Sequence, residues 1–518
     1  MVRVEESVPG EIQTRRNLLR SGGVGALAVA FPAVTRPRPA IRWRAAAAGG
    51  SGLPAPDPIV HLVDRITFGA TPAEVARARE LGFAGFIEEQ LHPDEIDDSA
   101  VEAAVAKRFP TVALDQLALE AYDRLQVAFE LKAATVYRAV ASRRQLLEMM
   151  ADFWSNHFNV FHLDGPAAYF KTVEDRELIR RHALGRFRDL LGGSAASPAM
   201  IVYLDNFSNL KERPNENYAR ELMELHTLGV DGGYSEADVE EVARAFTGWT
   251  LRKIDPAGPR ADQFSFNADQ HDDSARTVLG TEIPAGLGIG HGQGVLDILA
   301  AHPSCAGFLA FKLCRRFVAD DPPASLVERA AATFTQTGGD IREVLRTILL
   351  SSELLAAADQ KLKRPLEVVV SALRTLQAQL APEAMPALLT VLEEMGQLPF
   401  NWPPPNGYPD VADAWGNTNG LLDRWNLMLA LGWNGLPGVQ VDFAALTAGL
   451  FRPTPAEVTD HLTARLLARE LDPADRRQVI RYVAAGGPAD APILQRKLRS
   501  AAMGTAALLL SSPYFQWR

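Results

Sequence analysis

Two glutamates and an asparagine share one side of a helix predicted near the middle of the chain. Over residues 215–228, helical spacing places Asn217, Glu221 and Glu224 within about 60° of arc. Two carboxylates one turn apart are the ligands that Mg²⁺, Mn²⁺, Ca²⁺ or a carboxylate-bound iron uses. We therefore expect Glu221 and Glu224 to bind a divalent cation, with Asn217 and Arg220 orienting the substrate. The same pattern also fits a solvated helix face, because Arg220 lies four residues from a glutamate on either side.

Two histidine segments are candidates to complete this site. His157 lies at the edge of a polar stripe that includes Asp152, on a helix predicted over 143–160. His271 and Asp272 lie in the polar turn of a predicted hairpin. A histidine beside carboxylates is a candidate metal ligand or general base. The alternatives are a buried histidine satisfied by one hydrogen bond and, for the second segment, an exposed polar turn.

These residues favour a metal-dependent enzyme, with a hydrolase preferred over an oxidoreductase and an envelope or environmental polymer as substrate. The divalent metal cation would lower the pKa of a bound water and stabilise the developing oxyanion. The second hypothesis is a non-catalytic helical scaffold, or a binding partner of another exported protein, whose polar motifs are buried hydrogen-bond networks. The predicted metal ligands are Glu221, Glu224, His157, His271 and Asp272, and the predicted catalytic groups are His157, Asn217, Arg220 and His271.

A proline-rich segment over residues 397–420 carries broad aromatic side chains. Its five prolines fix the path of the chain. The aromatic residues suit either the lining of a cleft, where they would stack on sugar rings, or a rigid plug on the helical core. They are Phe400, Trp402, Tyr408 and Trp415.

The two cysteines of the chain are predicted to be inert. Cys305 and Cys314 lie in one segment with helical apolar spacing. Nine residues of helix separate them by about 13 Å of rise, so they cannot form a disulfide with each other. We interpret both as buried thiols, with a catalytic or metal-binding cysteine as the alternative.

The N-terminus has the pattern of an export signal. Paired arginines, Arg15 and Arg16, precede an uncharged stretch over 21–34 that is too short and too rich in glycine and alanine for a membrane span. This predicts a cleavable twin-arginine (Tat) signal over 1–35, followed by a disordered linker over 36–58. We therefore expect export through the Tat translocon to the periplasm or the extracellular space.

Composition excludes two classes of protein. The chain of 518 residues is 47% apolar, which is enough for one large core or two ordinary ones without disulfides. A net charge of −10 argues against a nucleic-acid binder, which would show a basic face. After the N-terminal signal no run is long and apolar enough to cross a bilayer, so we expect no transmembrane span in the mature protein.

Apolar residues recur with helical spacing along most of the chain. We predict a mostly α fold, a large multi-helix globular domain with a small inserted β-hairpin near residues 263–279. The strands of this hairpin are predicted at 263–266 and 276–279, where residues alternate with a period of two. The predicted organisation is a main helical domain over 59–436 and a C-terminal helical region over 437–518 packed on it.

Six segments resemble a large bacterial family catalogued as domain of unknown function 1800. Together they extend over nearly all of the chain that follows the predicted linker. The family pattern has a tryptophan at the position of Tyr408 in this chain. The matching segments are 61–69, 153–158, 215–229, 241–249, 363–367 and 402–406.

The resemblance implies an exported protein without a settled activity. Members of this family are typically exported, often with Tat signals. They are commonly encoded beside a second exported family that is similar to sulfatases and alkaline phosphatases. The resemblance therefore suggests a co-encoded, exported sulfatase-like protein as a partner.

Overall fold

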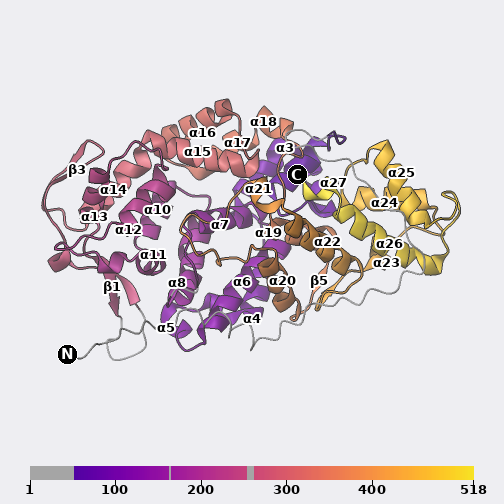
Figure 1. Cartoon of the computed structure of the whole chain (residues 1–518), viewed down its shortest axis with the longest axis horizontal. Helices are drawn as coiled ribbons and strands as arrows, with labels where there is room; N and C mark the ends of the chain where they lie inside the picture. The colour runs from indigo at the N-terminus through magenta and orange to yellow at the C-terminus, as the bar shows by residue number, and fades with distance from the viewer. Residues whose placement is uncertain (1–51, 163–164, 254–261) are drawn as a thin grey trace, which may run out of the picture. The chain divides into compact units, whose positions relative to one another are not determined.

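The protein is built almost entirely of helices (Figure 1). The computed structural model describes residues 52–162, 165–253 and 262–518. The predicted Tat signal at 1–35 and most of the predicted linker at 36–58 lie outside the described residues. Small antiparallel strand pairs accompany the helices, which confirms the predicted fold class.

The helices divide into those before and those after the β-strands near the middle of the chain. The earlier α-helices are α2 (Pro58–Ile66), α3 (Pro72–Leu91), α4 (Ser99–Arg108), α5 (Gln116–Leu119), α6 (Arg124–Ala141), α7 (Gln145–His157), α8 (Ala167–Glu174), α9 (Arg180–His182), α10 (Phe187–Ala195), α11 (Pro198–Tyr203), α12 (Asn217–Glu221) and α13 (Glu236–Ala245). The later ones are α14 (Gly290–Ala301), α15 (Pro303–Phe317), α16 (Ala324–Thr337), α17 (Ile341–Leu349), α18 (Ser352–Ala356), α19 (Pro365–Thr375), α20 (Ala384–Glu394), α21 (Ala412–Trp415), α22 (Thr418–Gly432), α23 (Phe443–Leu446), α24 (Pro455–Leu466), α25 (Pro473–Ala484), α26 (Gln495–Leu510) and α27 (Pro513–Gln516).

Tighter and wider helical turns interrupt this series. The 3₁₀ turns are η1 (Pro93–Glu95), η2 (Pro110–Ala113), η4 (Asn206–Ser208) and η6 (Ala268–Gln270). The π-helical turns are η3 (Asp175–Ile179) and η5 (Leu222–Thr227). A π-helix bonds each residue to the fifth along, so side chains within it no longer follow α-helical spacing.

Two hairpins take the place of the predicted one. All strand pairs are antiparallel: β1 (Trp249–Lys253) with β2 (Asp262–Phe266), β3 (Arg276–Val278) with β4 (Thr281–Ile283), and β5 (Gln379–Leu380) with β6 (Val439–Gln440). The runs predicted to pair with each other, 263–266 and 276–279, therefore belong to different hairpins. Leu279 and Gly280 have φ values of 49° and 74°, the left-handed pair of a type I′ turn, and they fold β3 back onto β4. Closing this two-residue loop costs less conformational entropy than closing the longer turn between the predicted strands at 263–266 and 276–279.

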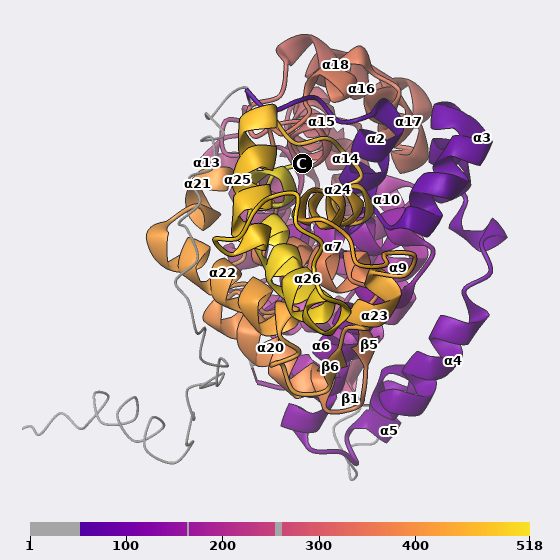
Figure 2. The same cartoon turned by 90° about the vertical axis from the view of Figure 1, so that its right-hand side faces the viewer.

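A continuous cluster of buried apolar residues extends through the described chain, from Leu53 to Phe515. In its C-terminal part, α26 packs against α22 and α24 (Figure 2). The short sheet of β5 and β6 adds a main-chain link between the segments before and after α22. The described residues belong to one compact unit.

Both cysteines lie in α15, as the sequence predicts. Cys305 and Cys314 are buried and form no disulfide. Burial raises the pKa of both thiols, that of Cys314 to about 12. A thiol that stays protonated at neutral pH is a poor nucleophile and metal ligand, which confirms the interpretation of both as inert.

No single helix among the described residues combines the length and the apolar character needed to cross a membrane. The helices α14 and α15 satisfy both criteria only when they are taken together, and the chain bends by 62° between them.

A buried carboxylate, Glu367, lies among three arginines. It accepts hydrogen bonds from Arg316, from Arg364 at 3.1 Å and from Arg518 at 2.9 Å. Arg364 also donates to Asp152 of α7 at 2.7 Å. Burial alone would raise the pKa of the Glu367 carboxyl, but the three arginines outweigh it and hold this pKa well below its ordinary value. These five residues, here called the Glu367 cluster, join α7, α15 and α19 to the C-terminal residue.

The Glu367 cluster gives the first prediction. Glu367→Gln keeps the shape of the side chain but leaves buried guanidinium groups without their counter-charge. We expect it to lower the free energy of unfolding by about 3–5 kcal/mol, measured by urea denaturation. The matched control is Glu353→Gln, which breaks the ion pair of Glu353 with the half-exposed Arg329 and should cost less than about 1 kcal/mol. Equal small losses in the two variants would contradict the structural importance of the cluster.

Candidate metal centre

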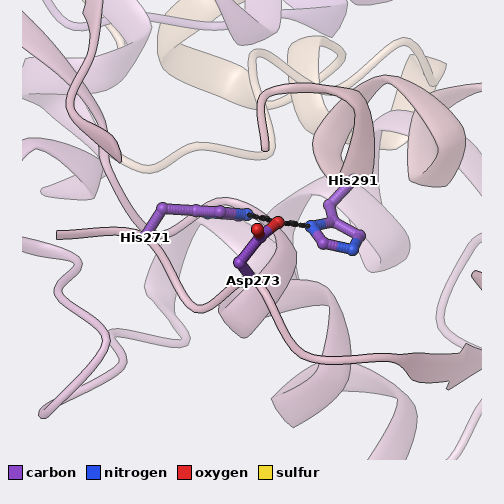
Figure 3. A group of neighbouring side chains, drawn as sticks. All are labelled: His271, Asp273 and His291. Atoms are coloured by element: carbon purple, nitrogen blue, oxygen red, sulfur yellow. Dashed lines mark hydrogen bonds and ion pairs between the residues drawn. The ribbon is translucent and has the colours of Figure 1, made fainter. Parts of the chain in front are cut away.

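Two histidines and an aspartate converge near the β3–β4 hairpin (Figure 3). The Nε2 of His271 lies 2.9 Å from the Nδ1 of His291. The Oδ1 of Asp273 lies 3.5 Å from the Nδ1 of His291 and 3.9 Å from the Nε2 of His271. Among the described residues, this is the one group of three or more His, Cys, Asp or Glu side chains whose ligand atoms all lie within 4.8 Å of one another.

Thr247 and Gly248 position His271, which follows the 3₁₀ turn η6. The ring of His271 donates its Nδ1–H to the main-chain oxygen of Thr247 at 2.8 Å. The Thr247 hydroxyl accepts the main-chain N–H of Asp272 at 2.8 Å. Gly248 has φ +77°, and a Cβ there would lie 2.4 Å from the carbonyl oxygen of Asn267. Only glycine lets the two segments approach this closely.

His291 and Asp273 are held by main-chain groups of the loop that precedes α14. The Nε2–H of His291 donates to the carbonyl oxygen of Pro284 at 2.9 Å. Asp273 accepts the main-chain N–H of Gly288 at 2.8 Å. Gly292 packs directly under the ring of Trp249, since a Cβ at this position would lie 2.6 Å from the indole. The glycines around His291 therefore allow α14 to begin against β1.

The hydrogen bonds fix which nitrogens of the two rings carry a lone pair. A carbonyl oxygen can only accept, so His271 is protonated at Nδ1 and His291 at Nε2. In the neutral rings, the two nitrogens that face each other at 2.9 Å are then both acceptors. Two lone pairs at this distance repel unless a proton or a cation lies between or beside them. Imidazoles whose second N–H donates to a main-chain carbonyl are the usual arrangement of histidine metal ligands.

The separations match those of ligands around one ion. Ligands bound at about 2.1 Å and at angles of 90–109° lie about 3.0–3.4 Å apart. The three observed separations run from 2.9 to 3.9 Å and bracket this range. A movement of a few tenths of an ångström would bring all three atoms to one cation.

Burial divides the group into an inner and an outer part. His271 is 4% exposed and His291 is fully buried, whereas the Asp273 side chain is 53% exposed. Burial is the main cause of a lowered pKa at His271, so its ring is neutral at pH 7 and offers its lone pair. The group therefore opens to solvent on the Asp273 side.

Asp272, predicted as a ligand, is used elsewhere. Its carboxylate accepts hydrogen bonds from Ser274 and, at 3.3 Å, from Arg244, and lies 3.8 Å from Arg276. These partners hold its pKa below the ordinary value although burial opposes them. The neighbouring Asp273, which the sequence analysis left out, takes the place beside the histidines.

His157 is also absent from the metal group. Its Nε2–H donates to the carbonyl oxygen of His226 at 3.1 Å, and its Nδ1 accepts from Lys312 at 2.8 Å. Phe153 stacks nearly parallel to its ring, with the centroids 6.3 Å apart. Burial, with Lys312 and His226 close by, holds the pKa of His157 well below its ordinary value. His157 is thus a neutral, satisfied side chain beside a lysine, the alternative considered in the sequence analysis.

The predicted acidic helix departs from regular α-helical geometry. It is α-helical only to Glu221 and continues as the π-helix η5, so the stripe expected from α-helical spacing is not regular. Glu221 is half-buried, and burial together with Glu224 raises its pKa. The two carboxylates are therefore neighbours, but neither belongs to the group that could hold a metal.

The remaining two predicted residues make structural contacts. Arg220 pairs with Glu216 at 3.1 Å, one of the two surface ion pairs that were the alternative to a substrate role, and with Glu236 at 2.7 Å, which that alternative did not include. Asn217 donates to the carbonyl oxygen of Leu204 at 3.3 Å. The predicted ligands and catalytic groups thus lie in several separate environments, because their assignment assumed a convergence that the fold does not produce.

The sequence contains a signal for His291 that pattern analysis missed. Glycines stand at 286, 288, 290, 292 and 294, so His291 lies in a stretch where every second residue lacks a side chain. Such a run allows close main-chain approach, which is a mark of sites that hold a ligand or a second segment. Its proximity to His271 depends on how two loops fold together, and spacing along the chain does not reveal that.

Comparison with known families identifies the chain. A family model described as protein of unknown function (DUF1800) matches residues 61–517. The chain belongs to the DUF1800 family. No curated protein and no solved structure matches it. In this DUF1800 protein the segment 241–249, one of those that carry the resemblance, supplies both Thr247 and Gly248 to the metal centre.

Gly248 supports a second prediction, which concerns the positioning of His271. Gly248→Ala places a Cβ against the carbonyl oxygen of Asn267 at a left-handed φ, so we expect a loss of about 2 kcal/mol in the free energy of unfolding. Gly307→Ala in α15 is the control, because its Cβ would meet no atom within 4 Å and should stabilise the helix slightly. Urea denaturation measures both. Equal stability of the two variants would show that the close approach at Gly248 is not required.

Proposed function

We propose that this DUF1800 protein is a metal-dependent enzyme that acts outside the cytoplasm, with hydrolysis of an envelope or environmental polymer as its reaction. One observation carries the proposal. His271 and His291 present lone pairs to each other at 2.9 Å, each fixed by a main-chain carbonyl, and Asp273 adds a carboxylate.

The donor set indicates the kind of metal. Two imidazole nitrogens and one carboxylate oxygen suit zinc or iron(II) better than Mg²⁺ or Ca²⁺, which prefer sites made of oxygen ligands. Three protein ligands leave at least one coordination position for water or substrate, as in catalytic zinc sites. A bound ion of this kind would lower the pKa of a water and stabilise an oxyanion.

The position of the centre suits a large substrate. His271 and His291 are buried and anchored, so they hold the inner side of the site rigid. Asp273 is half-exposed and marks the outer side. A polymer chain can bind to a site at the surface, whereas it could not enter a deep, narrow cavity.

The cellular setting rests on the sequence alone. The arginine pair and the uncharged stretch in residues 1–35 support export by the Tat translocon to the periplasm or beyond. The Tat route carries folded cargo, so a metal can be inserted before export. This setting fits an enzyme that acts on the cell envelope or on material outside the cell.

Metal binding gives the third prediction. We expect the metal-free protein to bind one zinc or iron(II) ion per chain, and His271→Ala and His291→Ala each to weaken this binding by more than about 100-fold, since even the loss of a residue that only orients a ligand costs 10–100-fold. Calorimetric titration under anaerobic conditions measures both metals. The control His182→Ala removes a histidine of α9, outside the centre, and should bind as the parent protein does.

Two results would count against the metal centre. The first is tight binding that persists in both histidine variants, which would place the ion elsewhere. The second is the absence of binding by the parent protein at micromolar metal. Folding of each variant is checked by circular dichroism, so that loss of structure is not taken for loss of a ligand.

A second candidate function, a binding partner of another exported protein, is favoured by one surface. Leu422, Trp425 and Leu429 of α22 lie three and four residues apart and are 52%, 46% and 37% exposed. They form an apolar stripe on one side of a surface helix, and such stripes mark sites of helix or protein contact. The partner suggested by the family resemblance is a co-encoded, exported sulfatase-like protein.

This candidate gives the fourth prediction. Co-expression with the exported sulfatase-like neighbour should yield a complex that elutes as one species in size-exclusion chromatography, and Trp425→Glu should abolish it. Leu355→Glu alters an equally exposed leucine on α18 and is expected to leave the complex intact. Failure of the two proteins to co-elute, or equal loss in both variants, would reject the α22 stripe as the contact surface.

A further inference from the structure

A cavity of about 300 Å³ lies between α7, α15 and the loop that precedes α21. This volume is at the lower end of the range for small-molecule sites. None of its lining residues belongs to the metal centre. Its wall includes residues from three of the segments that carry the resemblance to the family: 153–158, 363–367 and 402–406. We refer to it as the α15 pocket.

The wall of the α15 pocket is strongly cationic. Lys312, Arg315, Arg316 and Arg364 line it, and Asp410 is the one acidic residue among its lining side chains. The first three lie on one face of α15, because they are three and four residues apart. Arg316 and Arg364 are paired with carboxylates of the Glu367 cluster, so Lys312 and Arg315 supply the unpaired positive charge of the pocket.

Two of these cations have no carboxylate partner. Lys312 donates to the Nδ1 of His157 at 2.8 Å and lies over the ring of Phe308, 5.2 Å from its centroid. Arg315 donates to the carbonyl oxygen of Asp320 and lies over the ring of Phe311. Among the described residues, no carboxylate comes within ion-pair distance of either group. Burial lowers the pKa of Lys312 to about 8, against the attraction of Asp410, so most of the ammonium remains charged at pH 7.

Arg316 adds unused hydrogen-bond donors. Its side chain is 1% exposed, and its Nη1 donates to Glu367. Its Nε and Nη2 make no hydrogen bond, and a carboxylate oxygen of Asp152 is 3.9 Å from Nη2. Buried guanidinium N–H groups are normally paired, but these two donors are unused, and neither is open to solvent.

The opposite wall is aromatic and rigid. The rings of Trp402 and Tyr408 lie 4.9 Å apart between centroids, at 47°. Asn156 of α7 donates to the carbonyl oxygen of Tyr408 at 2.9 Å and accepts its N–H at 2.7 Å. Gly407 has φ +70°, and a Cβ there would lie 2.2 Å from the carbonyl oxygen of Asn156. The loop is therefore fixed against α7, and both Trp402 and Tyr408 line the pocket.

We propose that the α15 pocket binds a small acidic sugar, whose anionic group contacts Lys312, Arg315 and Arg316 and whose ring stacks on Trp402 and Tyr408. Charged hydrogen bonds from lysine and arginine recognise carboxylate and phosphate groups alike. Aromatic faces bind the apolar side of a ring. This inference goes beyond the proposed metal-dependent reaction, because the pocket and the metal centre share no residue.

The test is a calorimetric titration of the folded protein with four probes: glucuronate, glucose 6-phosphate, glucose and inorganic phosphate. We expect binding of glucuronate or glucose 6-phosphate, and the tighter of the two identifies a carboxylate or a phosphate as the natural group. Glucose and inorganic phosphate should each bind at least about tenfold more weakly, since each lacks one of the two recognised parts.

Variants then locate the site. Lys312→Met keeps the length of the side chain without its charge, and Arg315→Met removes the neighbouring charge on the same face of α15 in case the first variant does not fold. We expect each to weaken binding of the acidic sugar by about tenfold or more, and Trp402→Leu to weaken it through loss of stacking. Lys107→Met, on the exposed side of α4, is the matched control and should bind as the parent protein does.

Three outcomes would overturn the proposal. They are the absence of binding by both sugar acids at millimolar concentration, binding that is unchanged in the folded pocket variants, and equal affinity for inorganic phosphate and the sugar acids. Metal binding is measured in a separate titration, on the parent protein and on His291→Ala. A failure of sugar binding therefore does not contradict the proposed metal centre.

Discussion

The arrangement of the long helices depends on one buried carboxylate. Glu367 could not remain charged in the core without the three guanidinium groups around it, and those groups come from segments far apart along the chain. Because Arg316 belongs to this cluster, the face of α15 that carries Lys312 is fixed by the same charges. The metal centre is built differently, since main-chain carbonyls and glycines hold its histidines.

Local patterns predicted the local structure well. The helical class and the position of both cysteines in one helix follow from spacing and side-chain chemistry over a few residues. Strand positions were also readable, but strand pairing was not, because a left-handed Leu279 completes a turn that usually requires glycine or asparagine. The polar stripe of α7 was correct as geometry, yet its members contact three different neighbours.

The candidate site was only partly predictable. His271 was found because a histidine followed by two acids is conspicuous in a loop, but the choice between Asp272 and Asp273 depends on the direction of each side chain. His291 comes from a different element and meets His271 through tertiary packing. Glu221 does not belong to this group, and the π-helix that follows it changes the spacing between Glu221 and Glu224. The spacing of residues along the chain predicts local structure, but it does not predict contacts between distant segments.

The contacts of Arg65 affect how the chain folds during its synthesis. This fully buried side chain donates to the carbonyl oxygens of Val318, Ala357 and Arg518, the last of them 453 positions away along the chain. Contacts of such long range close late, because the intervening loop must be ordered first. A ribosome-bound chain therefore exposes apolar helices until residue 518 has been synthesised, and its maturation should depend on chaperones that shield them.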